Sequence, residues 1–349
     1  DWNMRLINYL QHIKRFVKRS KNTYLMHAPV ISISMPAYNV EKFISEAIES
    51  ILAQTFTDWE LIIVDDCSKD KTLAIASEYA AKDSRIRIIK RKENSGSARL
   101  PRFDGILSAC GEYICAIDSD DAIEPEYLQK MINRQQETGC DIVLGRMRLC
   151  NQALQEDGRM IPDAQYNMSK IFCGREAVIA TLGGWQIAMA GMLVASKLDL
   201  DYVKQNYDPK RNTIFADELD QRKLLLSASS VAIKDASYLY RQQQGGVIHK
   251  VNLRRFDQLI DIGYYLDFVF QNFTDDRDTK NKVLKECLER TYRCQQMFLA
   301  NKKVFKKEER NYISKLIKTT YKRVTSNEIT GLGFKYKLLS VSYTLFIAT

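Results

Sequence analysis

Short apolar runs alternate with amphipathic stretches through the first 150 residues of the chain. The apolar runs predict buried strands at residues 30–35, 60–64, 85–90, 112–117 and 141–144. The amphipathic stretches between them predict helices at residues 43–52, 71–81, 100–109 and 126–137. Strand and helix therefore alternate about every 25 residues, which is typical of an α/β fold with a mostly parallel sheet flanked by helices.

The two ends of the chain follow other patterns. Residues 1–29 predict a basic amphipathic helix, with an apolar stripe opposite several Arg and Lys side chains. Residues 251–349 predict a C-terminal helical extension, with helices at 253–273, 280–299 and 308–323 and an apolar tail at 334–349. Basic helices of this kind can bind an anionic membrane surface. The alternatives are packing against the protein's own core and formation of a homodimer.

Composition narrows the class of protein. A hydrophobic fraction of 45% over 349 residues is enough for a sizeable core, in one large domain or two smaller ones. The eight cysteines form no Cys-x-x-Cys pair and lie mostly in apolar stretches, which favours reduced thiols and a cytoplasmic location. The basic residues and apolar tail of the C-terminal region are compatible with a peripheral position on the inner face of the cell membrane. No apolar run approaches the roughly 20 residues of a spanning helix, and no signal peptide is evident. The net charge of +9 gathers at the chain ends without a recognised nucleic-acid module, so no nucleic-acid partner is expected.

An acidic cluster, Asp118-Ser119-Asp120-Asp121, directly follows the predicted strand at 112–117. Three carboxylates this close repel one another and raise one another's pKa unless a cation neutralises them. Carboxylate oxygens are suited to Mg²⁺ or Mn²⁺ held jointly with the phosphates of a substrate. The alternative is a solvated acidic turn that caps the next helix.

Further polar side chains follow the other predicted strands, with Tyr38 after the first and Asp65 and Asp66 after the second. In parallel sheets, ligands bind beyond the carboxyl ends of the strands. An aromatic ring can stack on a base, a carboxylate can accept a hydrogen bond from a base or ribose, and Arg99 or Arg102 can neutralise phosphate. These groups suit a nucleoside diphosphate, whereas the lack of a P-loop and of Gly-x-Gly-x-x-Gly disfavours those two nucleotide-binding classes. Asp65 could equally bond turn amides as a structural residue.

Four segments, in this order and at this spacing, resemble family 2 glycosyltransferases: VISISMPAYN at 30–39, LIIVDDCS at 61–68, GEYICAI at 111–117 and DSDD at 118–121. The likeness is close over residues 30–150 and looser up to residue 245. It implies a Rossmann-like GT-A fold, a nucleotide-sugar donor that is most often UDP-linked, a divalent cation (Mn²⁺ or Mg²⁺) and inversion at the anomeric carbon. It also implies a glycan or lipid-linked acceptor, most commonly in surface polysaccharide biosynthesis.

By position, the resemblance assigns donor binding to residues at the strand ends and in two basic loops. Asp121 is the favoured ligand for the cation, with Asp120 beside it. Arg102 matches a loop arginine of the family, but Phe103 stands where the family usually has Asn, so Arg99 competes for the same role. The implied donor-binding residues are Pro36, Ala37 and Tyr38 around the base, Asp66 at the uracil or ribose, Asp118 and Asp120 at the ribose and diphosphate, and Arg102 and Arg241 at the phosphates.

The acceptor half should supply a general base, because inverting transfer must remove the proton of the acceptor hydroxyl. The family has a Glu-Asp pair, with the second residue as base, where this chain has Asp217-Glu218. Alignment therefore points to Glu218 and leaves Asp217 as the alternative, while helix capping would select the same pair without catalysis. The segment that contains Trp185 resembles one that lies under the acceptor in this family, which makes Trp185 a candidate acceptor contact. The alternative is that Trp185 is a buried core residue. His249 follows Arg241 in a glycine-containing loop and could reach the metal or pyrophosphate.

These inferences combine into one hypothesis about domains and function. Residues 30–250 form a GT-A glycosyltransferase domain, with a nucleotide-sugar half at 30–150 and an acceptor half at 151–250, between the helix at 1–29 and the helical region at 251–349. The chain is predicted to be an inverting, metal-dependent glycosyltransferase. The alternatives are a nucleotidyltransferase or sugar-nucleotide pyrophosphorylase, which normally has a glycine-rich basic loop after the first strand, and a non-catalytic sugar-binding member of the family.

Overall fold

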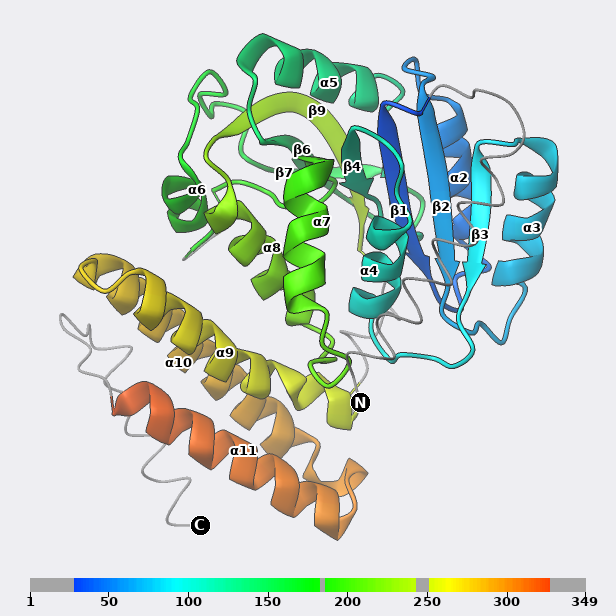
Figure 1. Cartoon of the computed structure of the whole chain (residues 1–349). Helices are drawn as coiled ribbons and strands as arrows, with labels where there is room; N and C mark the ends of the chain where they lie inside the picture. Colours follow the sequence, from blue (N-terminus) through cyan, green and yellow to red (C-terminus); the bar gives the residue numbers. More distant parts are fainter. Residues whose placement is uncertain (1–27, 183–185, 243–250, 327–349) are drawn as a thin grey trace.

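The computed structural model describes residues 28–182, 186–242 and 251–326. In these residues a nine-stranded sheet forms the larger part of the molecule, and three long helices pack beside it (Figure 1). The strand order is β3-β2-β1-β4-β8-β6-β9-β5, with β7 paired to β6. The predicted N-terminal helix and the apolar tail at 334–349 lie outside the described residues.

The first half of the sheet is parallel, as the alternation of strands and helices predicts. β1 (Ile31–Ala37) pairs with β2 (Trp59–Asp65) and with β4 (Tyr113–Ala116), and β2 pairs with β3 (Ile86–Lys90). The register places Ala37 opposite Asp65, so β1 and β2 end side by side. Because β2 lies on one side of β1 and β4 on the other, the strand order switches here, at the position where open α/β sheets form a binding crevice.

The second half of the sheet adds antiparallel pairs that the alternation does not predict. β8 (Leu193–Ala195) runs antiparallel to β4 and to β6 (Ile142–Cys150), and β7 (Glu156–Ile161) runs antiparallel to β6. β9 (Val231–Arg241) runs parallel to β6. β5 (Ala122–Ile123) pairs antiparallel with β9, so the acidic turn that precedes β5 is held against β9.

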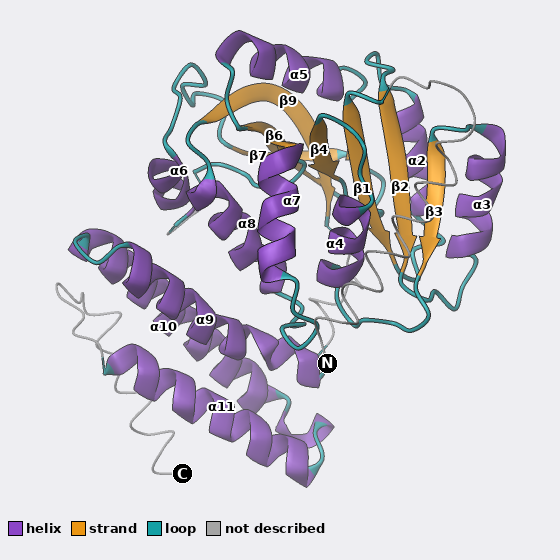
Figure 2. Ribbon diagram, viewed as in Figure 1, coloured by secondary structure: helices purple, strands orange, loops and turns teal. Residues whose placement is uncertain are grey.

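Helices cover both faces of the sheet (Figure 2). Successive side chains of a strand point to opposite faces, so Ile142 and Leu144 enter one hydrophobic cluster and Val143 enters the other. One cluster includes side chains of α2, α3 and α5, and the other includes side chains of α4, α6, α7 and α8. The bounds are α2 (Ile44–Leu52), α3 (Thr72–Lys82), α4 (Arg99–Leu107), α5 (Tyr127–Thr138), α6 (Gly174–Thr181), α7 (Ser196–Asn206) and α8 (Ala216–Ser227).

Helix α4 lies close against β1 because a glycine and a serine meet between them. A Cβ atom at Gly105 would overlap Ser34 Oγ, so a larger residue would push the helix away from the strand. Ser34 Oγ also donates a hydrogen bond to the Arg102 carbonyl at 3.0 Å. This contact fixes the first turn of α4, and with it the Arg102 side chain, beside the carboxyl ends of β1 and β4.

The C-terminal helices continue the core of the second half of the sheet. They are α9 (Asp257–Asn272), α10 (Arg277–Ala300) and α11 (Lys307–Thr325), with short 3₁₀ helices η1 (Leu253–Phe256) and η2 (Lys302–Val304), and they confirm the helices predicted in this region. One hydrophobic cluster extends from Leu219 of α8 to Phe256 and Ile317. All eight cysteines are free thiols. None of the described helices is long and apolar enough to cross a membrane.

Candidate active site

The turns after β1 and β2 are tied together at the carboxyl edge of the sheet. The Asp66 N–H donates to the Ala37 carbonyl at 2.9 Å, and the Asn39 side chain accepts a hydrogen bond from the Lys69 N–H at 2.7 Å. Tyr38, between them, is 43% exposed. The residues predicted around the base therefore come together here, and the ring of Tyr38 is accessible for stacking. Pro36, the last residue but one of β1, also lies at this edge and pairs with Val64 of β2.

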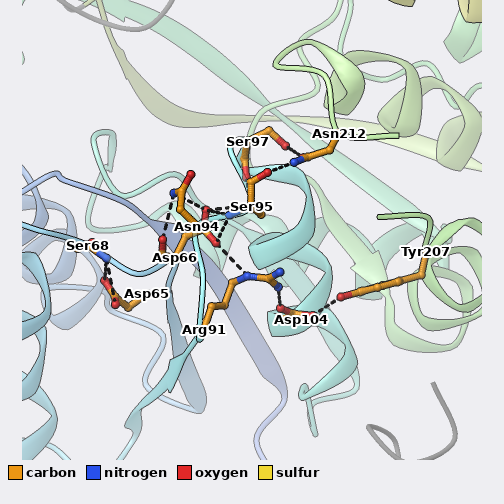
Figure 3. Close-up of polar contacts among 10 residues, drawn as sticks. All are labelled: Asp65, Asp66, Ser68, Arg91, Asn94, Ser95, Ser97, Asp104, Tyr207 and Asn212. Atoms are coloured by element: carbon orange, nitrogen blue, oxygen red, sulfur yellow. Dashed lines mark hydrogen bonds and ion pairs between the residues drawn. The ribbon is translucent and has the colours of Figure 1, made fainter. Parts of the chain in front are cut away.

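Asp66 holds the loop that follows β3 (Figure 3). Its carboxylate accepts hydrogen bonds from the Asn94 amide at 2.9 Å and from the Ser95 N–H at 3.0 Å and hydroxyl at 2.8 Å, and pairs with Arg91 at 2.9 Å. Burial raises the pKa of Asp66, and the bonds from Ser95 and the charge of Arg91 oppose that rise. Asp66 is 2% exposed, so it shapes the wall of the base site instead of presenting an open carboxylate.

The same loop is linked to the segment that precedes α8 (Figure 3). Arg91 also pairs with Asp104, which accepts a hydrogen bond from the Tyr207 hydroxyl at 2.9 Å. The Asn212 amide donates to the Ser95 carbonyl. The donor side of the site and the start of α8 therefore share one polar network. Asp65, by contrast, accepts from the Ser68 N–H at 3.3 Å, which is the structural role predicted as its alternative.

The acidic turn between β4 and β5 presents its carboxylates in different directions. Asp118 is 37% exposed and pairs with Arg102 at 2.7 Å. Asp121 is 2% exposed, and its two oxygens accept hydrogen bonds from the Tyr238 hydroxyl and the Arg241 N–H, both at 2.8 Å. Burial raises the pKa of Asp121 well above its usual range, and the negative charges of Asp120 and Asp118 raise it further. In this structure Asp121 faces the protein interior and Asp118 the open edge, and the role of Asp121 as the favoured metal ligand stays a prediction.

Arg241 anchors this turn instead of closing over it. Its side chain donates to the Asp120 carbonyl at 2.6 Å and the Gln152 carbonyl, and pairs with Glu46 at 2.5 Å. Arg241 is 4% exposed at the end of β9, where its guanidinium is engaged by these protein groups, and its contact with the diphosphate stays a prediction. The rest of that predicted loop, with His249, lies outside the described residues, and so does Trp185.

The carboxylates of the acidic turn can hold a divalent cation only when a substrate supplies further ligands. Asp118 and half-buried Asp120 bring two carboxylates to the same edge, and their charges already raise the pKa of Asp121. The described residues nevertheless contain no group of three or more His, Cys, Asp or Glu side chains that could hold a metal ion. Mg²⁺ and Mn²⁺ sites commonly combine one or two carboxylates with substrate phosphates. The residues therefore fit a cation held jointly with a diphosphate, and do not fit an all-protein cage.

The structure separates the two arginines that competed for the donor. Arg99 is 2% exposed and pairs with Asp220 at 2.5 Å, while its other nitrogens donate to three backbone carbonyls, one at the last residue of α7 and two in the segment before α8. Arg102 lies between Asp118 at 2.7 Å and Asp217 at 3.6 Å. Burial opposes the charge of Arg102, but the two carboxylates outweigh it and raise the pKa of the guanidinium. Arg102 is therefore placed to meet a substrate, and Arg99 fastens the chain before α8.

The adjacent carboxylates Asp217 and Glu218 face different surroundings. Glu218 accepts from Arg222 at 2.8 Å and from Arg290 of α10 at 2.7 Å. Burial would raise the pKa of Glu218, but the two arginines outweigh it and lower the pKa to about 2. Asp217 is 39% exposed on the side of Arg102, and its pKa is raised by burial, against the lowering effect of Arg102. The geometry thus favours Asp217 over Glu218, the residue that alignment favoured, as the group that can accept a proton.

A cavity of about 330 Å³ joins these groups. It extends from Asp118, Arg102 and Asp217 between the sheet and helices α4, α7 and α8, and its volume lies in the usual range of ligand pockets. Its walls are mostly apolar, with two further carboxylates: Asp220, which pairs with Arg99 and Arg211, and Asp199. The other lining side chains include Phe103, Ile106, Met189, Met192, Val194, Tyr202, Gln221, Leu224, Tyr238 and Tyr240.

Sequence reasoning missed three side chains that matter here. Arg290 lies 72 residues after Glu218, and Tyr238 lies 117 residues after Asp121, so no local pattern indicates either contact. Asp199 sits in an ordinary amphipathic helix and carries no motif. Only the Tyr-x-Tyr alternation at the end of β9 gave a signal, because alternate residues of a strand share a face.

Comparisons with known proteins agree with this geometry. The model of the family "Glycosyl transferase family 2" matches residues 32–185. The glycosyltransferase GlyG of Streptococcus pneumoniae is 30% identical over 226 residues, which cover 63% of this chain and 73% of GlyG. A poly(ribitol-phosphate) beta-glucosyltransferase of Bacillus spizizenii is 32% identical over 221 residues, or 62% of this chain. The chain matches 33% of the length of that longer relative.

A solved structure has the same fold. The crystal structure of residues 1–349 of S. aureus TarS with UDP-GlcNAc superposes with a TM-score of 0.63 at 22% identity, over 90% of this chain and 88% of that one. This likeness covers the C-terminal helices as well as the sheet. With the sheet order, the polar edge and the matched relatives in agreement, the chain belongs to glycosyl transferase family 2.

Proposed function

We propose that this glycosyltransferase moves a sugar from a UDP-sugar to a hydroxyl group of a glycan or lipid-linked acceptor in surface polysaccharide synthesis, with inversion at the anomeric carbon. The observation that carries the proposal is the convergence of Arg102, Asp118 and Asp217 in one cavity at the carboxyl edge of the parallel strands. Relatives support the substrate class: two are named for glucosyl or N-acetylglucosaminyl transfer involving poly(ribitol-phosphate), and TarS has been crystallised with UDP-GlcNAc. The "beta" in those names is the linkage that inversion of an α-linked UDP-sugar produces.

Asp217 is the proposed base. It accepts the proton of the acceptor hydroxyl while that oxygen forms a bond to the anomeric carbon and the bond to the diphosphate oxygen breaks, so that UDP leaves with the electron pair. Burial raises the pKa of Asp217, which makes it a better proton acceptor than an ordinary aspartate, and the positive charge of Arg102 opposes part of that rise. Glu218 is unsuited to this role because its lone pairs are engaged by two arginines.

Arg102 and the acidic turn handle the negative charge of the donor. Arg102 lies between the carboxylate of the turn and that of the base, so its guanidinium can move its hydrogen bonds to a phosphate or sugar oxygen as charge develops. Asp118 and Asp120 would hold a divalent cation jointly with the diphosphate, and such a cation would supply further neutralisation of the leaving group. Tyr38 supplies the exposed ring for the base of the nucleotide.

The test is release of UDP from UDP-glucose and UDP-GlcNAc in the presence of Mn²⁺ or Mg²⁺, with and without a poly(ribitol-phosphate) acceptor. Asp217→Asn should lower turnover by about 10²–10⁴-fold while keeping UDP-dependent thermal stabilisation. Asp201→Asn is the matched control, since Asp201 lies on α7 and pairs with the exposed Lys197 in a surface contact. Full turnover by Asp217→Asn would refute the assignment of Asp217 as the base. Absence of both turnover and UDP binding in the wild-type protein would refute the proposed function.

We also propose a cytoplasmic, peripheral location on an anionic membrane surface. Its support is a basic and apolar surface at η2, where Val304 is 64% exposed between the exposed side chains of Lys302, Lys303, Lys306 and Lys307. Anionic lipid attracts such lysines, and an exposed aliphatic side chain can enter the interface. Sedimentation with phosphatidylglycerol vesicles, but not with phosphatidylcholine vesicles, is expected. Equal binding to both would contradict an electrostatic attachment. The alternative role of the helical region is formation of a homodimer.

A further inference from the structure

A buried carboxylate lies in the cavity without a protein partner. Asp199 belongs to the first turn of α7 and is 5% exposed. It lines the same cavity as Arg102, Asp118 and Asp217. Within the described part of the chain its side chain makes no hydrogen bond or ion pair, and the positive charge of Arg102 acts on it from beyond ion-pair distance.

This arrangement is unusual among the buried carboxylates of the structure. Asp66 has four donors, Asp220 pairs with Arg99 and Arg211, and Asp121 accepts two hydrogen bonds. Asp199 has none of these, and burial raises its pKa to about 7, with Arg102 lowering it in part. Removing a carboxylate from water without a compensating bond is costly, so the fold alone would be better served by an apolar residue at this position.

The shape and charge of the cavity indicate that the sugar ring is the part of a sugar nucleotide that lies against Asp199. A diphosphate would be repelled by the carboxylate, and a polymeric acceptor needs an open groove, whereas Asp199 is almost fully enclosed. A hexose ring fits both features of this space: its C–H groups match the apolar walls formed by Ile106 and Val194, and its hydroxyl or amide groups can donate to a carboxylate. The anomeric carbon must also lie near Asp217 for proton transfer, which places the ring at the entrance to this cavity.

We propose that Asp199 receives a hydrogen bond from a hydroxyl or amide N–H on the ring of the transferred sugar, and that it thereby helps to set which sugar is transferred. The inference rests on the proposed function. A site built to pair with a polar group of a substrate discriminates strongly against sugars that lack it, because its own buried group is then left unpaired. Asp199 would act as a specificity-determining residue, while Asp217 takes the proton.

The experiment combines stability with donor selection. Asp199→Asn and Asp199→Leu are compared with wild type for melting temperature and for kcat/KM with UDP-glucose, UDP-galactose and UDP-GlcNAc, with Asp201→Asn as the control on the same helix. The expected result is a higher melting temperature for Asp199→Leu, together with a fall of about tenfold or more in kcat/KM for the preferred donor, the value of one charge-assisted hydrogen bond. The ratios of kcat/KM among the three donors should move towards one, because kcat/KM falls less for the less preferred donors.

Two results would overturn the inference. If both Asp199 variants keep the wild-type kcat/KM and donor preference, the carboxylate does not contact the sugar. If Asp199→Leu loses stability and Asp199→Asn keeps the wild-type donor preference, its role is structural. Failure of the proposed function is distinguishable, because the wild-type protein would then turn over none of the three donors and UDP would not raise its melting temperature, and the inference would fall with it.

Discussion

Glu218→Gln tests the ion cluster that holds the start of α8 against α10. In this cluster Glu218 accepts from Arg222 at 2.8 Å and from Arg290 at 2.7 Å, and its side chain is 17% exposed. Its pKa is lowered from 4.5 to about 2, and because each pKa unit corresponds to about 1.36 kcal/mol, the pairs contribute about 3 kcal/mol at neutral pH. Since the folded-state pKa is depressed, this contribution is present above pH 4.5 and is lost as the pH falls towards 2.

The expected result is a loss of stability with retention of chemistry. A loss of about 3 kcal/mol lowers the melting temperature by about 4 °C in a chain of this length, taking about 2.1 cal/mol/K of unfolding entropy per residue. UDP release, measured well below the melting temperature, should stay close to the wild-type rate. Asp217→Asn should do the reverse, since it removes the base but breaks only the looser contact of Asp217 with Arg102 at 3.6 Å.

Two comparisons make the measurement decisive. The double variant Glu218→Gln/Arg290→Gln should be less destabilised than the sum of its single variants, because the two residues share one interaction. Glu126→Gln removes an exposed pair with Lys130 and should change stability by less than about 0.5 kcal/mol. Loss of turnover in Glu218→Gln at full stability, with normal turnover in Asp217→Asn, would show that the base has been assigned to the wrong carboxylate.

Three further outcomes follow from the structure. Arg99→Met should lower the free energy of unfolding by about 3–5 kcal/mol, measured by urea unfolding, because it takes one ion-pair partner from the buried Asp220. Arg102→Met should chiefly lower kcat/KM, by about 10²-fold or more. Chelation by EDTA should abolish UDP release and Mn²⁺ or Mg²⁺ should restore it, and full activity in EDTA would contradict a cation at the acidic turn. The stability gained by Asp199→Leu should grow between pH 5 and pH 8, because the pKa of Asp199 is raised to about 7 and wild-type stability falls as the pH rises through it. A gain that does not change with pH would contradict this.

Much of the fold could be read from local patterns. The apolar runs that predicted β1 to β4 are strands in the structure, and β1, β2 and β4 are buried along nearly their whole length. The segments that predicted α9 to α11 are helices. Period and composition suffice here because each element buries one face or one run in a shared core. The pattern could not predict the antiparallel β8, a run of three residues, or the pairing of β5 with β9, because those pairings depend on contacts between distant segments.

The candidate site divides in the same way. Motif spacing located the strand ends, and the structure brings Tyr38 and Asp118 to one edge of the sheet. Motif spacing could not predict which of two neighbouring charged side chains faces the substrate. Arg99 and Arg102 are three residues apart in one helix, yet one is fastened by Asp220 and the other meets Asp118.

What the sequence by itself determined was the alternation of elements, the family and the short segments that carry the chemistry, because these depend on residues near one another in the chain. What only the tertiary structure decided was the direction and charge environment of each side chain. Asp217 and Glu218 are adjacent in sequence, but Arg290 reaches Glu218 from α10 and Arg102 reaches Asp217 from α4. The pKa and accessibility of a carboxylate depend on its neighbours in space, and those neighbours come from helices that the local sequence does not contain.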